Sequence, residues 1–251
     1  MSKKHKEHKE DKSQFVPQRD KIKDSLQINE FPWTEKQKQL IDLILNKDTK
    51  MVFISGPAGT SKTLISAYCG LKLLNDKKVS DILYIRTIIE SASKSMGALP
   101  GFADEKFQPF LMPLEDKLHE LVQPAQVNKL LDDKRIQAMP INFVRGASWN
   151  ARYIWAEEQQ NATFGEITTL ITRLGKFSKM IIVGDPNQSD LNGKSGFRTM
   201  FNIFNDEESR KNGIFTFEFT KEDIMRSGTV KFIVEKLEQH KEIKSKEPMF
   251  S

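Results

Sequence analysis

The sequence Ile54-Ser55-Gly56-Pro57-Ala58-Gly59-Thr60-Ser61-Lys62-Thr63 follows an apolar run and precedes residues at helical spacing. It fits the phosphate-loop pattern G-x-x-x-x-G-K-[ST] at Gly56, Lys62 and Thr63, with Ser61 in place of the second glycine. Such a loop turns backbone N–H groups inward and aims a helix amino terminus at an anion. We therefore expect Lys62 at the β- and γ-phosphates of a nucleotide and Thr63 on Mg²⁺. The expected nucleotide-binding residues of the loop are Gly56, Pro57, Ala58, Gly59, Thr60, Ser61, Lys62 and Thr63.

Ser61 decides how well this loop is built. A serine costs little if its dihedral angles lie in the helical or β region, whereas a positive φ would cost roughly 1–2 kcal/mol. Gly56 and Gly59 give the backbone freedom that the turn needs, and Pro57 stiffens it. The alternative is a turn rich in Gly, Ser and Thr with an incidental Lys-Thr pair, which needs neither the strand before it nor the helix after it.

The length and composition fit one domain with charged ends. The 251 residues, 38% of them hydrophobic, suffice for one large α/β domain or two small ones, and we expect one. We predict a disordered charged tail over 1–24, a single domain over 25–240 and a flexible tail over 241–251. Because no apolar run approaches the ~20 residues that cross a bilayer and no signal peptide is evident, we expect a cytoplasmic protein without a membrane partner.

Charge and cysteine content narrow the class further. The net charge is +5, but residues 1–24 contribute +3 and residues 241–251 contribute +1, so the body is close to neutral. Solvated tails explain this charge as well as a phosphate-binding arm does. The single cysteine, Cys69, falls on the expected buried face of the helix after the phosphate loop, so we expect packing rather than a disulfide.

Short apolar runs bounded by turn residues alternate with helical patterns along the body. We predict strands over 51–55, 82–86, 141–144, 152–156, 180–183 and 214–219. We predict helices over 34–45, 64–74, 107–121, 125–131, 164–174 and 229–239, the first of them capped by Thr34. This alternation predicts an α/β fold with a mainly parallel sheet covered by helices on both faces.

Paired carboxylates follow the fourth predicted strand, at Glu157 and Glu158. We expect Glu157 to hold Mg²⁺ through its water shell and Glu158 to polarise the water that attacks the γ-phosphorus. The usual metal-holding residue is Asp, so Glu157 is one methylene longer. The alternative is a solvated acidic helix start, which the helix dipole favours.

A third polar turn, Gly184-Asp185-Pro186-Asn187-Gln188, follows the next apolar run. The side-chain amide of Gln188 can sense the γ-phosphate by donating a hydrogen bond to it. The carboxyl ends of parallel strands meet at one edge of a sheet, where such folds bind ligands. We therefore expect the phosphate loop, the two glutamates and Gln188 to surround one nucleotide site.

Together these segments resemble the PhoH-like proteins, a family of phosphate-starvation-inducible P-loop ATPases whose core is similar to the first motor domain of superfamily 1 helicases. The resemblance covers about residues 33–237, and the order and spacing of its segments make it specific. The segments are Gly56 to Thr63, Met96-Gly-Ala-Leu-Pro-Gly101, Glu105-Lys106, Pro109-Phe-Leu-Met-Pro113, Arg145-Gly146, Glu157-Glu-Gln-Gln-Asn161-Ala-Thr163, Thr172-Arg-Leu-Gly175, Gly184-Asp-Pro-Asn-Gln188 and Ser195-Gly196. The resemblance implies a RecA-like P-loop NTPase fold.

The resemblance also implies further site residues. Helicase-like relatives read adenine with a glutamine ahead of the loop, which Gln37 matches; the alternative is an exposed helix residue. Arg173 and Arg226 match family arginines that contact the γ-phosphate in the same subunit or a neighbour's, the alternative being surface or salt-bridged arginines. The family's acidic motif is usually Asp-Glu-Ala-Gln-Asn. The departures at Glu157 and Gln159, with Ser61, therefore concern the hydrolysis rate more than nucleotide binding.

The leading interpretation is an Mg²⁺-dependent ATPase that couples ATP hydrolysis to RNA or single-stranded DNA, as a helicase does. Trp149, Phe102 or Phe107 would then stack on bases, although aromatics in apolar segments are more often core. Helicases close two motor domains over ATP. We therefore expect a chain with one such domain to form a homo-oligomer, with a hexameric ring as one form and ATP near the subunit boundary.

Two other classes of function stay open. The first is an ATP-dependent assembly or regulatory switch with little hydrolysis, which Ser61, Glu157 and the charged tails favour. The second is a small-molecule P-loop kinase, in which the turn at Gln188 has no evident role and which lacks an Arg-rich lid here.

Overall fold

The computed structural model describes residues 20–87, 103–144, 148–191 and 193–225, and also 228, 232 and 236; within 103–111 it describes the backbone alone. The charged tails expected over 1–24 and 241–251 and the helix expected over 229–239 therefore lie almost entirely outside the described residues. The division into one domain and two tails stays a prediction.

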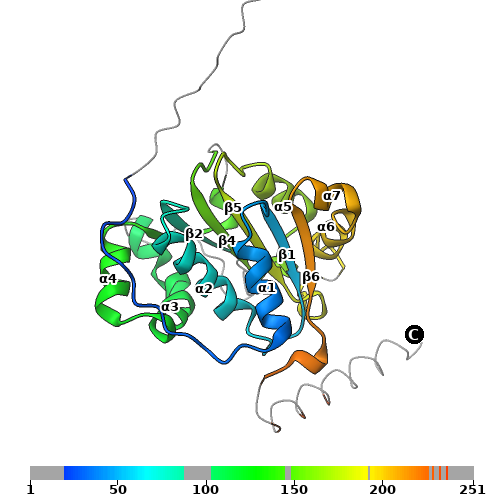
Figure 1. Ribbon diagram of the computed structural model, residues 1–251. Helices are drawn as coiled ribbons and strands as arrows, with labels where there is room; N and C mark the ends of the chain where they lie inside the picture. Colours follow the sequence, from blue (N-terminus) through cyan, green and yellow to red (C-terminus); the bar gives the residue numbers. More distant parts are fainter. Residues whose placement is uncertain are drawn as a thin grey trace, which may run out of the picture.

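The described elements alternate between helices and strands (Figure 1). In chain order they are α1 Glu35–Leu45, β1 Met51–Ser55, α2 Lys62–Asn75, β2 Asp81–Arg86, α3 Ala103–Leu121, α4 Pro124–Asp132, β3 Ile136–Pro140, β4 Arg152–Glu157, α5 Phe164–Ile171, β5 Lys179–Gly184, α6 Phe197–Ile203, α7 Glu207–Lys211 and β6 Ile214–Glu218. Short 3-10 turns follow β3, β4, β5 and β6.

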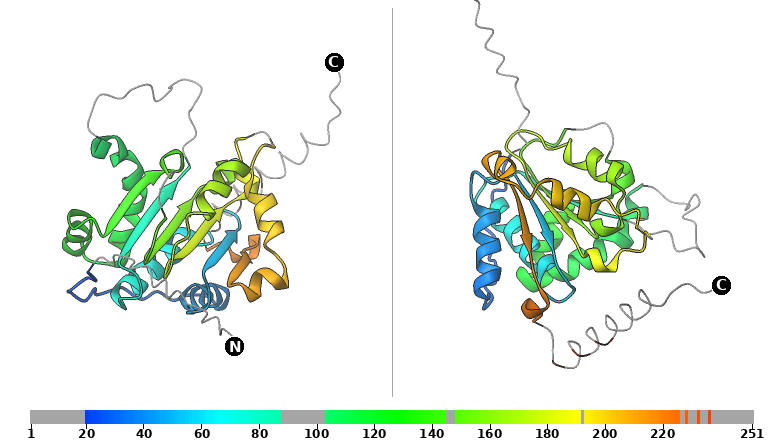
Figure 2. Two further views of the ribbon diagram at one scale, coloured as in Figure 1. Left: turned by 90° about the horizontal axis from the view of Figure 1, so that it is seen from above. Right: turned by 90° about the vertical axis from the view of Figure 1, so that its right-hand side faces the viewer.

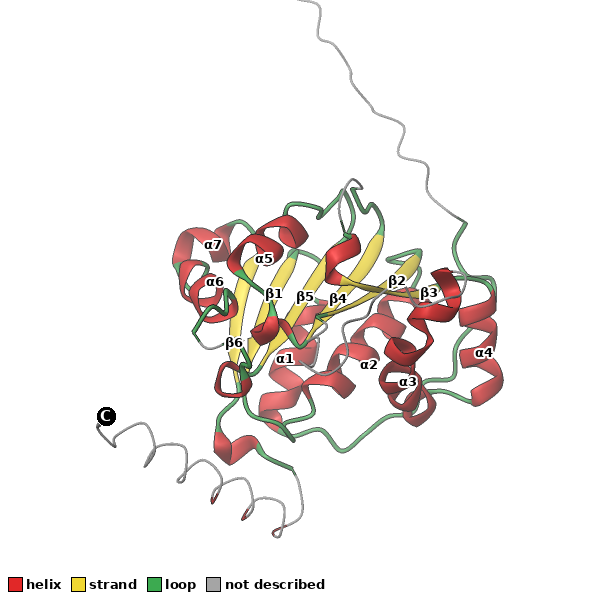
Figure 3. Cartoon of the chain, turned by 180° about the vertical axis from the view of Figure 1, so that it is seen from behind, coloured by secondary structure: helices red, strands yellow, loops and turns green. Residues whose placement is uncertain are grey.

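Among the described residues the strands form one sheet in the order β3-β2-β4-β5-β1-β6, and every neighbouring pair is parallel (Figure 3). All residues of β1 and β5 are buried, as expected for strands covered on both faces. The predicted parallel α/β fold is confirmed.

Helices cover both faces of the sheet (Figure 2). On one face, α1, α2, α3 and α4 bury apolar side chains such as Leu40, Leu71 and Leu118 against the strands. On the other face, α5 and α6 contribute Ile167 and Phe197 to a second apolar layer. Cys69 is buried in the first layer, as predicted. No described helix combines the length and the apolar character that a bilayer span requires.

One predicted strand is wrong. The run 141–144 forms a 3-10 turn, Ile141–Phe143, and the strand lies just before it as β3. Since β3 is an edge strand that pairs only with β2 and is half-exposed in its middle, it lacks a continuous apolar run. Ile141 and Val144 are instead buried in the second layer. The short helices α6 and α7 were not predicted either.

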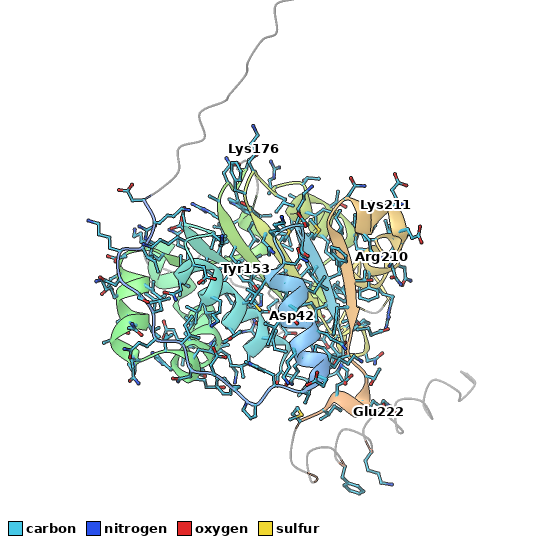
Figure 4. All side chains as sticks on the ribbon, in the orientation of Figure 1. Asp42, Tyr153, Lys176, Arg210, Lys211 and Glu222 are labelled. Atoms are coloured by element: carbon cyan, nitrogen blue, oxygen red, sulfur yellow. The ribbon has the colours of Figure 1, made fainter. Side chains whose placement is uncertain are left out.

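The two edges of the sheet differ in what they carry. We call the edge formed by Ser55, Glu157 and Gly184, where β1, β4 and β5 end, the carboxyl edge. We call the opposite edge, where these strands begin, the amino edge. In Figure 4, Glu222 lies on the carboxyl-edge side and Lys176 on the amino-edge side.

Candidate functional site

The phosphate loop joins the end of β1 to the start of α2 at the carboxyl edge. Gly56 has a φ of +153°, and a Cβ there would lie 2.7 Å from the Cβ of Phe219. Gly59 has a φ of +90°. Both positions therefore require glycine, the first for space and backbone angle together and the second for backbone angle.

Ser61 has a φ of +65° and a ψ of +19°, in the left-handed region. The sequence left open whether Ser61 has helical or β dihedral angles or a positive φ. The structure shows the positive φ, whose backbone strain costs roughly 1–2 kcal/mol. The Ser61 carbonyl accepts the Ile65 N–H at 2.9 Å, which starts α2. The serine thus holds the conformation that the usual glycine would adopt without strain.

The Lys62 ammonium lies across the loop. It donates hydrogen bonds to the carbonyl oxygens of Gly56 and Pro57, both at 2.7 Å. The amino end of α2 begins at the same residue. A cation and a helix amino terminus therefore meet inside the loop, and this arrangement fits a phosphate group.

Glu157 lies at the end of β4 with its carboxylate held at both oxygens. The Thr63 hydroxyl donates to Oε1, and the Tyr84 hydroxyl donates to Oε2 at 2.9 Å. Glu157 is only 7% exposed, and this burial raises the pKa of its carboxyl group, whereas the two hydrogen bonds and the charge of Arg86 act in the opposite direction.

Thr63 and Glu157 together fit the way Mg²⁺ is held beside phosphates, with one or two protein oxygens and several waters. The described residues contain no group of three or more His, Cys, Asp or Glu side chains that would hold a metal by themselves. A divalent ion at this pair would therefore share its coordination with phosphate and water oxygens. The hydrogen bond from the Thr63 hydroxyl to Glu157 Oε1 brings these two oxygen atoms together, where both could face one divalent ion.

Gln160 fixes the second glutamate. Its Nε2 donates to the Glu158 carboxylate at 2.6 Å, and its Oε1 accepts the Asp185 N–H at 3.1 Å. Glu158 itself has a φ of +57°, which turns the chain sharply after β4. The ends of β4 and β5 are thus joined through one amide side chain, and the Glu158 carboxylate is held at their junction.

These groups surround one cavity of about 410 Å³, within the size range of small-molecule sites. Eight of the residues predicted from the sequence line it, among them Lys62, Thr63, Glu157, Glu158 and Gln188. Ala58, Gly59 and Ser61 complete the loop wall. The structure therefore brings the three predicted strand ends to one place.

Several residues at this site had not been predicted. Tyr84 and Gln160 hold the two glutamates, and Lys117 and Glu120 of α3 line the far wall of the cavity. The one sequence signal for Tyr84 is a polar-tipped aromatic inside an apolar strand, two positions before the end of β2. Nothing in the sequence points α3 toward the phosphate loop.

The segment after β6 wraps the phosphate loop from outside. The Phe219 N–H donates to the Ser55 carbonyl at 2.8 Å, and the Met225 N–H donates to the Gly59 carbonyl at 3.0 Å. Met225 lines the cavity and is 56% exposed. The cavity is therefore bounded on this side by the chain that follows the last strand.

Gln37 lies at the amino end of α1 and is 3% exposed, so it is not an exposed helix residue. Its Oε1 accepts the Thr34 N–H at 3.0 Å, and the Thr34 hydroxyl accepts the Gln37 N–H at 3.3 Å. This capping box begins α1, as the sequence predicted for Thr34. Gln37 does not line the cavity, and its contact with adenine stays a prediction.

Arg173 lies away from the cavity. It follows α5, and its carbonyl accepts the Trp149 N–H just before β4 begins, at the amino edge. Arg173 therefore does not line the cavity of its own subunit, and its contact with the γ-phosphate stays a prediction. Arg226 lies outside the described residues.

Some of the segments on which the family resemblance rests lie outside the described residues. The segments 96–101 and 145–146, and the side chains of Phe102 and Phe107, lie outside the described residues. Trp149 is buried in the second apolar layer. It therefore does not present a ring for stacking on a base.

Comparison with known proteins agrees with this geometry. The family described as "PhoH-like protein" matches residues 31–238. A "PhoH-like protein" of Mycobacterium tuberculosis is 34% identical over 213 residues, covering 84% of this chain and 58% of the relative. That of Synechocystis is 33% identical over 208 residues, covering 82% and 61%, and "Protein PhoH2" of Bacillus subtilis is 34% identical over 163 residues, covering 63% and 37%.

The chain thus spans about three fifths of the length of its PhoH-like relatives from Mycobacterium tuberculosis and Synechocystis. The matched region contains the whole described sheet and all three strand ends of the cavity. The chain belongs to the PhoH-like protein family.

Proposed function

We propose that this chain is a Mg²⁺-dependent ATPase that couples ATP hydrolysis to RNA or single-stranded DNA. The observation that carries the proposal is the convergence of Lys62, the Glu157–Glu158 pair and Gln188 on one cavity in a member of this family. A cation, a metal-binding oxygen pair and a second carboxylate are the groups that phosphoryl transfer to water requires.

Each residue then has a separate task. The loop N–H groups and Lys62 bind the β- and γ-phosphates, and Gln188 donates its amide to the γ-phosphate. Glu158, oriented by Gln160, accepts a proton from the attacking water. Thr63 and Glu157 hold Mg²⁺, which neutralises charge on the phosphate oxygens.

Phosphate release from ATP tests the hydrolytic half of the proposal. Lys62→Ala should abolish both ATP binding and turnover, and Glu158→Gln should keep binding but lower kcat by about 10²–10⁴-fold. Lys38→Ala is a matched control, because Lys38 is exposed and, within the described part of the chain, its one ion pair is with Glu35 on α1. Turnover in Glu158→Gln equal to the wild type would contradict the proposal.

The second candidate is an ATP-dependent switch with little hydrolysis. The strained φ of Ser61 and the extra methylene of Glu157 favour it, because both alter the geometry around the phosphates. Tight ATP binding with negligible wild-type turnover, with and without single strands, would select the switch. Fast turnover that both substitutions abolish would select the ATPase.

The nucleic-acid and assembly parts of the proposal have their own tests. Adding single-stranded RNA or DNA should raise the rate of phosphate release, and no effect of either would remove the coupling. We also propose a cytoplasmic homo-oligomer, a hexameric ring being one form, in which Arg173 or Arg226 contacts ATP bound to a neighbour. Met225, which precedes Arg226, lines the cavity of its own subunit, so a contact of Arg226 within the same subunit is the alternative. Sedimentation that detects only monomers with and without ATP would exclude the oligomer.

A further inference from the structure

A second cavity, of about 620 Å³, lies at the amino edge, at the opposite end of the strands from the phosphate loop. It is formed by the start of β1, the start of β5, the turn before β5 and the carboxyl ends of α1 and α2. Its lining residues are Leu45, Lys47, Thr49, Lys50, Leu73, Lys78, Val79, Leu174, Gly175, Lys176, Phe177, Ser178 and Lys179. Five of these thirteen are lysines and none is acidic, so the cavity attracts anions.

Four of the lysines, Lys47, Lys50, Lys78 and Lys176, are exposed, and we call them the amino-edge lysines. Within the described part of the chain no ion pair involves any of them. Asp48 and Asp76 are chain neighbours of this group but do not line the cavity. Lys176 extends away from the body of the molecule in Figure 4. Among the described residues, the amino-edge lysines therefore line the cavity without an ion-pair partner.

Lys179 has a different role. It is buried, and its Nζ donates to the carbonyls of Ile44 and Asn46 at the end of α1, the latter at 2.6 Å. Burial lowers the pKa of Lys179 to about 8. It is therefore a structural part of the cavity floor, and the amino-edge lysines carry the accessible charge.

An aromatic ring stands beside these charges. Phe177 is 70% exposed and has a φ of +59°, a conformation that is unusual for a bulky residue. The turn is fixed from both sides, because the Lys176 N–H donates to Asn150 Oδ1 at 2.8 Å and the Ala151 N–H donates to the Lys176 carbonyl at 2.9 Å. The structure holds an exposed ring in a strained position, which points to a binding role.

We propose that this amino-edge cavity binds a single-stranded nucleic acid, with backbone phosphates on the amino-edge lysines and one base stacked on Phe177. Alternating phosphates and flat bases match a set of lysines interleaved with an aromatic ring and an apolar floor. An acidic peptide would match the charge but would leave the ring and the apolar floor unused. The segment 1–19 is a poor occupant, since its six Lys and Arg against three acids repel the lysines. This inference rests on the nucleic-acid part of the proposed function.

The two cavities are separate surfaces joined by the same strands. β5 begins at Lys179 in the amino-edge cavity and ends next to Asp185 in the nucleotide cavity, about 20 Å away. Lys47, Lys78, Lys176 and Phe177 have no assigned part in nucleotide binding, so their substitution should leave ATP turnover without nucleic acid unchanged. This separates the two proposals experimentally.

Fluorescence anisotropy with labelled U20 RNA and dT20 DNA, at 50 and 200 mM salt, provides the test. The triple variant Lys47→Ala/Lys78→Ala/Lys176→Ala should raise Kd at least tenfold and make the slope of log Kd against log salt shallower by about 2, since each single-strand phosphate contact contributes about 0.7. The control Lys23→Ala/Lys38→Ala/Lys194→Ala removes the same charge from other exposed sites and should change Kd less than twofold.

Phe177 is tested independently of charge. Phe177→Ala should raise Kd about tenfold without changing the salt slope, because it removes the stacking of one base and no charge. Phe177→Tyr, which keeps the ring, should bind as the wild type does. Circular dichroism and the melting temperature of each variant show whether it is folded.

The outcomes distinguish this inference from the proposed function. If the wild type binds no single strand even at 50 mM salt, the nucleic-acid part of the proposed function fails and this inference fails with it. If the wild type binds and both triple variants lose affinity equally, nucleic-acid binding stands but the amino-edge cavity is not the binding surface. Displacement of U20 by polyglutamate of equal length and concentration would overturn the assignment in favour of an acidic peptide.

Discussion

The Tyr84 hydroxyl donates a hydrogen bond to Glu157 Oε2 at 2.9 Å, from β2 to the neighbouring strand β4. In the parallel register Tyr84 lies opposite Trp155, and Glu157 is two positions further along, so both side chains lie on the same face of the sheet. Because Tyr84 fixes one oxygen, the other remains directed at Thr63. The longer side chain of Glu157 thus has a defined position despite its extra methylene.

Tyr84→Phe should weaken Mg²⁺ binding about 10–100-fold, because a partner that orients a metal-binding carboxylate contributes that much to affinity. The Mg²⁺ concentration that gives half-maximal ATP turnover should rise accordingly, with a smaller change in kcat at saturating Mg²⁺. Tyr68→Phe is the control, since the Tyr68 hydroxyl bonds Glu30 at 2.7 Å away from the cavity. An unchanged Mg²⁺ requirement would show that Thr63 alone positions Glu157.

Mg²⁺ affinity should also depend on pH through Glu157. Burial raises the pKa of this carboxyl group, and only the ionised form binds a cation, so affinity should increase with pH through the raised pKa and then level off. A proton is bound more tightly in the folded state than in the unfolded one. The group therefore stabilises the fold most at low pH, and this contribution is lost as pH rises through the folded pKa.

Denaturant unfolding of the wild type and Glu157→Gln, from pH 4 upward, measures this effect. The free energy of unfolding of the wild type should fall relative to that of Glu157→Gln as pH rises above about 4.5. A difference that does not vary with pH would contradict the raised pKa.

Ser61→Gly should stabilise the protein. The glycine removes a left-handed strain of roughly 1–2 kcal/mol but adds freedom to the unfolded chain, so a net gain of up to about 1 kcal/mol is expected. Ser61→Ala keeps a Cβ at the same φ and should show no such gain. Urea unfolding of the three proteins checks this order, and a wild type more stable than Ser61→Gly would show that the serine side chain contributes a favourable contact.

Substitutions at Gln37 separate two roles of one side chain. The capping box needs only the Oε1 acceptor, whereas reading adenine uses both the acceptor and the amide donor. Gln37→Glu should therefore keep the melting temperature but lower the ratio of kcat/KM for ATP over GTP about tenfold. Gln39→Ala, at an exposed position of the same helix, should change neither quantity. An unaltered ratio in Gln37→Glu would leave the residue as a helix cap.

The strand ends of the site could be predicted from the sequence because each follows a short apolar run and ends in a polar turn. Parallel pairing then brings Lys62, Glu157 and Gln188 to one cavity without further information. The contact from Tyr84 depends on which strands are neighbours and in what register, which local patterns do not determine. The backbone angle of Ser61 likewise follows from how the loop closes onto α2.

The edge strand β3 shows the opposite case. Its half-exposed middle gives a weaker apolar pattern than the run 141–144 after it. The sequence therefore predicts the strand at 141–144 and not at β3. Ile141 is buried because the 3-10 turn packs it against the second apolar layer. The residues that it contacts there are distant from it in the sequence. Tertiary packing here overrides local β propensity.

The hydrogen bond from the Met225 N–H to the Gly59 carbonyl joins the phosphate loop to the chain that leaves the sheet. Any nucleotide that shifts Gly59 therefore also shifts the free energy of the segment beyond β6. By thermodynamic linkage, a ligand or subunit that binds this segment and changes nucleotide affinity by some factor must have its own affinity changed by the same factor. Phosphate binding at the loop and partner binding to the chain that leaves β6 are thus coupled through one backbone hydrogen bond.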